Sequence, residues 1–119
     1  MWEHNFSIKN TLDLTNKLNG FDIPDGCTFL SFDIKDMYSN IPIYETLNIL
    51  KEDLTSTNKL EDYEINDILK LTETTLNQNY FEYDGSYYHQ KNGLAMGSPL
   101  SGLLADVFIH NLEETKIMN

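Results

Sequence analysis

Apolar residues at helical spacing predict four helices along the chain. In one of them, Ile43, Leu47 and Leu50 fall on a single face. Pro42 stands just before this helix, where a helix start tolerates its missing N–H. The predicted segments are 8–20, 43–54, 61–78 and a loop followed by a helix over 93–118.

Two other stretches have strand patterns. An apolar, β-prone run opens the segment 28–38 and predicts a strand, buried on at least one face, that ends in a turn. The segment 80–90 predicts a β-hairpin, because Asp84-Gly85 supplies the positive φ angles of a two-residue turn. Aromatic side chains of this hairpin could stack on nucleobases, although alternation along its strands favours packing against a core. Helices and strands together predict an α+β fold.

Composition limits the size and the partners of the protein. The chain has 119 residues, enough for one domain or part of one. Its net charge is -11, and all eight basic residues are Lys, which disfavours a basic groove for nucleic-acid phosphates. The single cysteine, Cys27, excludes an internal disulfide and suits an intracellular location, in the cytoplasm or the nucleus. No stretch approaches the roughly 20 apolar residues of a membrane span, so no membrane association is expected.

Carboxylates gather where the predicted strand ends. Asp33 is the last polar residue of the strand, and Asp36 follows three residues later. Carboxylate oxygens on a rigid support suit Mg²⁺ at a phosphate, and Tyr38 would place a ring beside the bound group. An Asp at a strand end also commonly terminates the strand or caps a helix, so both interpretations stay open.

The loop before the last helix is the second informative stretch. Gly93 and Gly97 let the backbone approach a ligand closely. Ser98 can cap the following helix and Pro99 suits its first position, so a helix N-terminus could face an anion or a nucleotide. A plain loop-to-helix transition explains the same residues equally simply.

Taken together, the two stretches resemble conserved motifs of reverse transcriptases. SFDIKDMYSNIPI (31–43) resembles motif A, and GLAMGSPLSGLLADVFIHNLEE (93–114) resembles motif B with its helix. The predicted hairpin lies between them, as it does in that family, and the wording is most similar to Penelope-like retroelements. The resemblance spans 8–114, and it implies a right-hand polymerase palm with part of the fingers.

The resemblance assigns roles to individual residues of the motif A stretch. Asp33 matches the catalytic aspartate that binds the metal ions, and the backbone carbonyl of Ile34 matches the ligand beside it. Asp36 and Met37 match positions whose backbone N–H groups meet the incoming triphosphate. Tyr38 matches the aromatic steric gate that excludes a ribose 2′-OH.

Motif B contributes further nucleotide-binding positions and some departures from the family pattern. Gly97, Ser98 and Pro99 match the turn beside the nucleotide and the template. Many reverse transcriptases have Gln four residues before this turn; that position here is Gly93, while Gln90 lies three residues earlier, so the nucleotide roles of both stay open. No Asp-Asp pair occurs in the chain, so motif C is absent and we expect a palm truncated before the motif C hairpin.

The implied enzyme is an RNA-directed DNA polymerase that uses two-metal nucleotidyl transfer. The complete enzyme would require Mg²⁺ or Mn²⁺, an RNA template, a DNA primer and deoxynucleotides. With one of the three catalytic carboxylates and its acidic charge, the chain alone is expected to be an inactive fragment that binds nucleic acid weakly or not at all. The alternative is a decayed or domesticated retroelement remnant that acts only as an acidic interaction domain.

Overall fold

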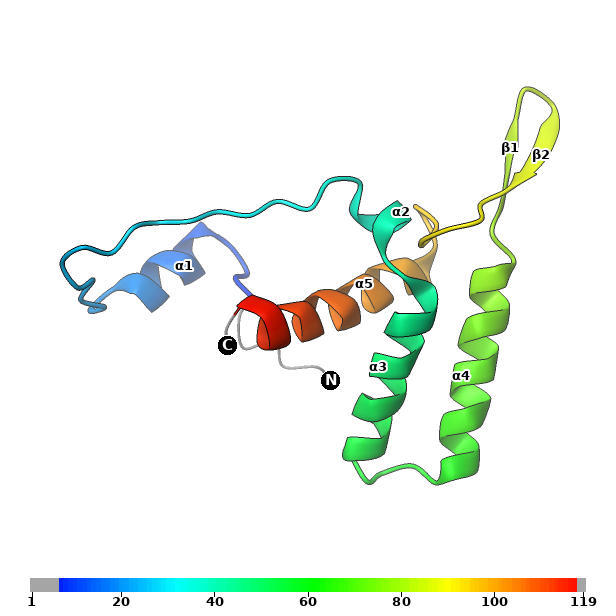
Figure 1. The fold of residues 1–119 in the computed structure, drawn as a ribbon, viewed down its shortest axis with the longest axis horizontal. Helices are drawn as coiled ribbons and strands as arrows, with labels where there is room; N and C mark the ends of the chain where they lie inside the picture. The colour runs from blue at the N-terminus through cyan, green and yellow to red at the C-terminus, as the bar shows by residue number, and fades with distance from the viewer. Residues whose placement is uncertain (1–6, 118–119) are drawn as a thin grey trace. The chain divides into compact units, whose positions relative to one another are not determined.

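The computed structural model describes residues 7–117, which form a mixed α and β structure. These residues divide into two compact units, 7–33 and 34–117. Figure 1 shows the elements in chain order. Their bounds are α1 Thr11–Leu18, α2 Met37–Asn40, α3 Ile43–Ser56, α4 Asp62–Asn77, β1 Tyr80–Tyr83, β2 Ser86–His89, α5 Pro99–Leu112 and the π-helical turn η1 Glu113–Ile117.

The first unit contains α1, which is shorter than the predicted helix over 8–20. Asn10 caps its start, since the Asn10 side-chain oxygen accepts a hydrogen bond of 2.9 Å from the Asp13 N–H. The carboxylate of Asp13 in turn accepts from the Lys9 N–H and lies 3.4 Å from Lys17, and these contacts lower the pKa of Asp13. The helix ends before Gly20, which has a φ of +82°. Local polar contacts therefore fix α1.

The predicted strand over 28–38 does not form. Residues 28–34 have neither helix nor strand structure, and Phe29 is 83% exposed. The sheet formed by the described residues has two strands, β1 and β2, so this apolar run has no ladder partner within 7–117. Cys27, directly before this run, is also exposed. Only the end of the predicted segment is regular, as the single turn of α2.

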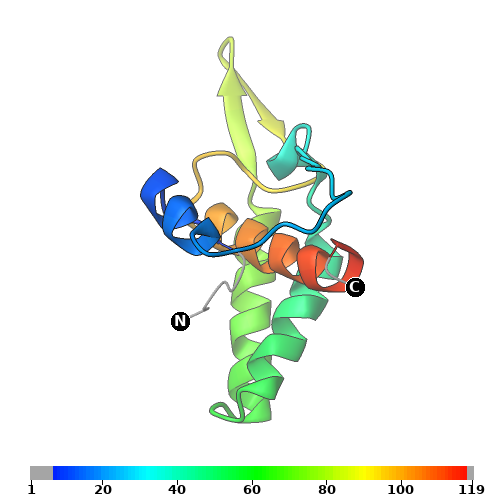
Figure 2. The same cartoon turned by 90° about the vertical axis from the view of Figure 1, so that its left-hand side faces the viewer.

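The second unit is organised around α3, α4 and α5. Helices α3 and α4 lie side by side and antiparallel, and α5 packs across α3 near the α2 end (Figures 1 and 2). Glu61 and Glu64 form a capping box at the start of α4, which explains why that helix begins in an acidic run. Pro99 occupies the first turn of α5, as predicted.

A small core lies between these helices. Its apolar members come from the residue after α2, from the loop before α5 and from all three long helices, and Leu94 and Leu104 are among the most buried side chains. Two buried polar residues, Thr46 and Ser101, donate their hydroxyls to backbone carbonyls. The buried apolar residues are Ile41, Ile49, Leu50, Ile65, Leu76, Leu94, Leu104, Ala105 and Val107.

The hairpin forms as predicted but does not pack. β1 and β2 pair with Tyr80 opposite His89 and Phe81 opposite Tyr88, and Asp84-Gly85 forms the turn. All eight strand residues are exposed, so the expectation that the aromatic side chains pack against a core is wrong for the described residues. Within the unit the hairpin projects beyond the end of α4, away from the helices (Figure 2). Across the strands the Tyr80 ring pairs with that of His89 and the Phe81 ring with that of Tyr88, and the His89 Nε2 lies 3.1 Å from the Asn77 carbonyl.

Candidate nucleotide pocket

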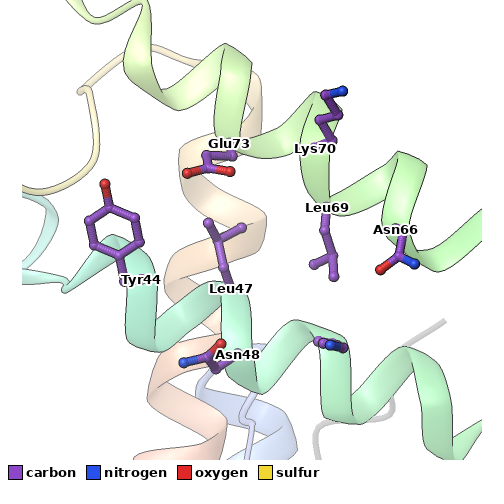
Figure 3. Close-up of a pocket in the computed structure, with 8 residues that line it drawn as sticks. Tyr44, Leu47, Asn48, Asn66, Leu69, Lys70 and Glu73 are labelled. Atoms are coloured by element: carbon purple, nitrogen blue, oxygen red, sulfur yellow. The ribbon is translucent and has the colours of Figure 1, made fainter.

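Two of the hollows in the second unit have similar volumes and are candidates for the site. One, of about 380 Å³, lies between α3 and α4. Figure 3 shows Leu47 and Leu69 pointing toward the opposite helix, whereas Lys70 points away from α3. Its polar groups therefore do not converge on a common point, and this groove offers no clear ligand geometry.

The other hollow joins the two motif stretches. It has a volume of about 350 Å³ and lies between the α2 turn, residues 36–41, and the loop 90–97. Asp36, Met37 and Tyr38, all predicted nucleotide-binding residues, line it from one side. Gln90 lines it from the other side, together with Asn92, Leu94 and Met96. A volume in this range is typical of small-molecule sites.

The α2 turn is held by its own side chains. Asp36 has a left-handed backbone conformation, with a φ of 49°, directly before α2. The Asn40 amide donates to the carbonyls of Lys35 and Asp36, each at 3.1 Å, and the Ser39 hydroxyl donates to the Asp36 carbonyl at 3.1 Å. These bonds close the turn around Tyr38 and fix its backbone.

The 90–97 loop is held at several points. The Gln90 side-chain amide donates to the carbonyls of Asn92 at 2.8 Å and Leu94 at 3.2 Å. Further along, the buried Ser101 hydroxyl donates to the Ala95 carbonyl at 2.5 Å. The side chain of Leu94 is buried. The loop thus has a defined conformation, which is the condition for a preformed pocket.

One hydrogen bond and one close approach join the turn to the loop. The Leu94 N–H donates to the Tyr38 carbonyl at 2.6 Å. Beside it, Gly93 is buried against the backbone of Ser39, and a Cβ on Gly93 would lie 2.5 Å from the Ser39 Cα. Since Gly93 also has a φ of +76°, only glycine fits this position without rearrangement. Gly93 therefore has a packing role between the loop and the turn, and its nucleotide role stays a prediction.

The remaining predicted site residues lie elsewhere. Gly97, Ser98 and Pro99 do not line the 36–41/90–97 pocket; Ser98 borders a separate hollow of about 210 Å³ with Gln78 and residues of α4. Ser98 stands at the N-cap of α5, but its side chain makes no capping hydrogen bond. Asp33 is exposed at the end of the first unit, and Ile34 begins the second unit.

The described residues 7–117 contain no preformed cluster of metal ligands. Mg²⁺ requires near-octahedral oxygen ligands, usually one or two carboxylates with substrate phosphates. Within 7–117, no group of three His, Cys, Asp or Glu side chains comes together in a way that could hold a metal ion. Asp33 and the Ile34 carbonyl, the ligands that the resemblance assigns, supply one carboxylate.

A separate charged cluster lies where α3 meets the end of α5. The Nε2 of His110 lies 3.4 Å from a carboxylate oxygen of Glu114 in η1. Burial raises the pKa of Asp53 in α3, the neighbouring carboxylates Glu114 and Glu52 raise it further, and His110 opposes the shift. This cluster is away from the pocket and bears on stability.

Comparisons with known proteins add no assignment: no family model, curated protein or solved structure matches the chain. Separately, none of the helices found in 7–117 is both long and apolar enough to span a membrane.

Sequence reasoning missed the residues that build the pocket. Asn40, Leu94 and Ser101 carry no catalytic signature, yet their bonds or burial hold the turn and the loop. Ser101 had a usable signal, because a serine among the apolar positions of a predicted core helix requires a buried acceptor. The contact of Gly93 with Ser39 had none, since it depends on residues far apart in the sequence.

Proposed function

We propose that this chain belongs to the palm of an RNA-directed DNA polymerase and holds the sugar of an incoming deoxynucleotide. The observation that carries the proposal is the pocket shared by the α2 turn and the 90–97 loop. The resemblance to motifs A and B implies that these two stretches meet at a nucleotide. Their direct contact through Tyr38 and Leu94 supports that implication.

Tyr38 is the residue that would select the sugar. It lines the pocket, it is half-buried, and its backbone is held both within α2 and by Leu94. A ring on a fixed backbone excludes an added 2′-hydroxyl by overlap, whereas a mobile ring would move aside. Asp36 and Met37 border the same pocket, where the resemblance places the triphosphate.

The proposal assigns nucleotide recognition to this chain and no chemical step. Nucleotidyl transfer in this class requires three carboxylates, and the chain has one candidate, Asp33. The net charge of -11 opposes tight binding of phosphates. Primer extension by the chain alone should therefore give only background, and an active protein would require additional carboxylates.

Nucleotide titration of the ¹⁵N-labelled chain tests the proposal. We expect dATP at millimolar concentration to shift the backbone signals of residues 36–41 and 90–97, and ATP to bind at least about tenfold more weakly, a difference of roughly 1.4 kcal/mol. Tyr38→Ala should remove this preference and Tyr38→Phe should keep it, because the ring is the obstacle.

Tyr44→Ala is the matched control, since Tyr44 is an exposed tyrosine that lines the α3–α4 groove instead. It should leave the preference for dATP unchanged. Shifts confined to residues outside 36–41 and 90–97, or equal binding of ATP and dATP by the unaltered chain, would contradict the proposal.

The hairpin favours a second candidate, an acidic interaction domain derived from a retroelement. Its exposed aromatic side chains, with Glu82 and Asp84, form a surface suited to a protein partner. In that case dATP and ATP would leave the signals of the pocket unchanged. The titration above therefore separates the two candidates.

A further inference from the structure

Gln90 stands at the pocket, but its amide is engaged within the protein. Its Nε2 donates to two loop carbonyls, those of Asn92 and Leu94, and its backbone N–H donates to the Asn79 carbonyl at 2.8 Å. The side chain is half-buried. A side chain whose amide hydrogens are directed at its own loop organises that loop and has no N–H left to offer a ligand.

The bonds of Gln90 lead directly to Tyr38. The Leu94 carbonyl accepts a hydrogen bond from the Gln90 side-chain amide, and the Leu94 N–H donates one to the Tyr38 carbonyl at 2.6 Å. The same peptide segment includes Gly93, whose backbone abuts Ser39, the residue after Tyr38. The loop conformation that Gln90 stabilises is therefore the one that reaches the α2 turn.

Two further interactions hold the loop, one at the Leu94 side chain and one after Leu94 in the sequence. Ser101 holds the Ala95 carbonyl, and the Leu94 side chain is buried in the core. Gln90 is the residue whose side chain spans the loop from its first position to Leu94. Hydrogen bonds that share one residue in this way couple the positions of their partners.

We infer that Gln90 is a positioning residue for Tyr38, acting through Leu94. It fixes the backbone from which the Tyr38 ring projects, and it uses its side-chain N–H donors within the loop to do so. The consequence for sugar selection rests on the proposed function, whereas the positioning does not. Loss of the Gln90 donors should release the Leu94 N–H and loosen the α2 turn.

Amide hydrogen exchange of the whole chain tests the positioning directly. Gln90→Leu keeps the bulk of the side chain but removes its donors. In this variant we expect the Leu94 amide to exchange at least about tenfold faster than in the unaltered chain, beyond any change caused by global unfolding. Gln90→Glu, ionised at neutral pH and lacking N–H donors, should do the same. Unchanged exchange at Leu94 in both variants would overturn the inference.

The dATP-to-ATP preference supplies the readout that general destabilisation would not change. We expect both Gln90 variants to reduce this preference several-fold, while Gln78→Leu, a glutamine at the end of α4, leaves both exchange and preference unchanged. Faster exchange at Leu94 with an unaltered preference would overturn the link to Tyr38. If the unaltered chain shows no preference, the proposed function fails, and the exchange result alone decides the positioning.

Discussion

The segment 28–34 and the α2 turn are neighbours in the sequence but differ sharply in structure. Residues 31–34 of the first and the whole α2 turn belong to the run 31–43 that resembles motif A. The first has apolar, β-prone residues, yet it is exposed and has no regular structure. The second is polar and only one helical turn long, yet its side chains close it, the 90–97 loop abuts it and Ile41 is buried beside it.

The difference shows that hydrogen-bonding and packing partners within the chain, and not local propensity, decide which stretch becomes ordered. A strand satisfies its backbone only through a neighbouring strand, and within 7–117 the two strands of the hairpin pair with each other. The α2 turn satisfies its backbone locally, through Ser39 and Asn40, and then receives one tertiary bond from Leu94. Four variants sharpen or break this comparison.

The largest effect is expected where packing is densest. Leu104 is 1% exposed in α5, and Leu104→Ala should lower the free energy of unfolding by about 3 kcal/mol through lost burial and a cavity. Leu103→Ala, one residue away but 49% exposed, should cost less than about 1 kcal/mol, and Phe29→Ala close to nothing. Urea unfolding followed by circular dichroism measures all three. A large loss in Phe29→Ala would show that 28–34 is packed in solution.

Gly93→Ala tests the close approach between the loop and the α2 turn. The new Cβ would clash with the Ser39 backbone in addition to the strain of a positive φ, so we expect a loss of about 2–3 kcal/mol in urea unfolding. Gly97→Ala is the control, because Gly97 has a φ of +90° but open space around it. Strain alone should cost about 1 kcal/mol there. Equal losses would mean that the contact with Ser39 contributes nothing.

Ser101→Ala removes the hydroxyl that holds the Ala95 carbonyl. Because this acceptor, next to the buried Leu94, is then left without its donor, we expect a loss of about 1–2 kcal/mol. Ser86→Ala, on the exposed hairpin, should change stability by less than about 0.5 kcal/mol. Thermal unfolding of the two variants gives the comparison, and a neutral Ser101→Ala would mean that the loop finds another donor.

The smallest effect concerns pH. Because the pKa of Asp53 is raised in the folded protein, its contribution to stability is present below the unfolded value of 3.8 and is lost as pH rises through the folded pKa. Asp53→Asn should therefore be more stable than the unaltered chain at pH 7, by at most about 0.5 kcal/mol given its partial exposure. This advantage should vanish near pH 3.

Asp67→Asn removes the same charge from an exposed site on α4 and controls for net charge. If it stabilises the chain as much as Asp53→Asn at pH 7, the effect comes from the total charge of -11 and not from the burial of Asp53.

Local patterns in the sequence determined the long helices and the hairpin. The spacing of Ile43, Leu47 and Leu50, the Asp84-Gly85 turn and Pro99 act within a few residues, so their effects can be read from the sequence. The candidate residues Asp36, Met37 and Tyr38 were predicted by another route, the resemblance of their stretch to motif A.

Only the tertiary structure decided which of these patterns acquired partners. The sequence could not show that 28–34 lacks a neighbouring strand, that the hairpin aromatics stay exposed, or that Gly93 fits against Ser39. Each of these depends on contacts between distant residues. Such contacts form only where burial and hydrogen bonding together outweigh the entropy lost by ordering the chain.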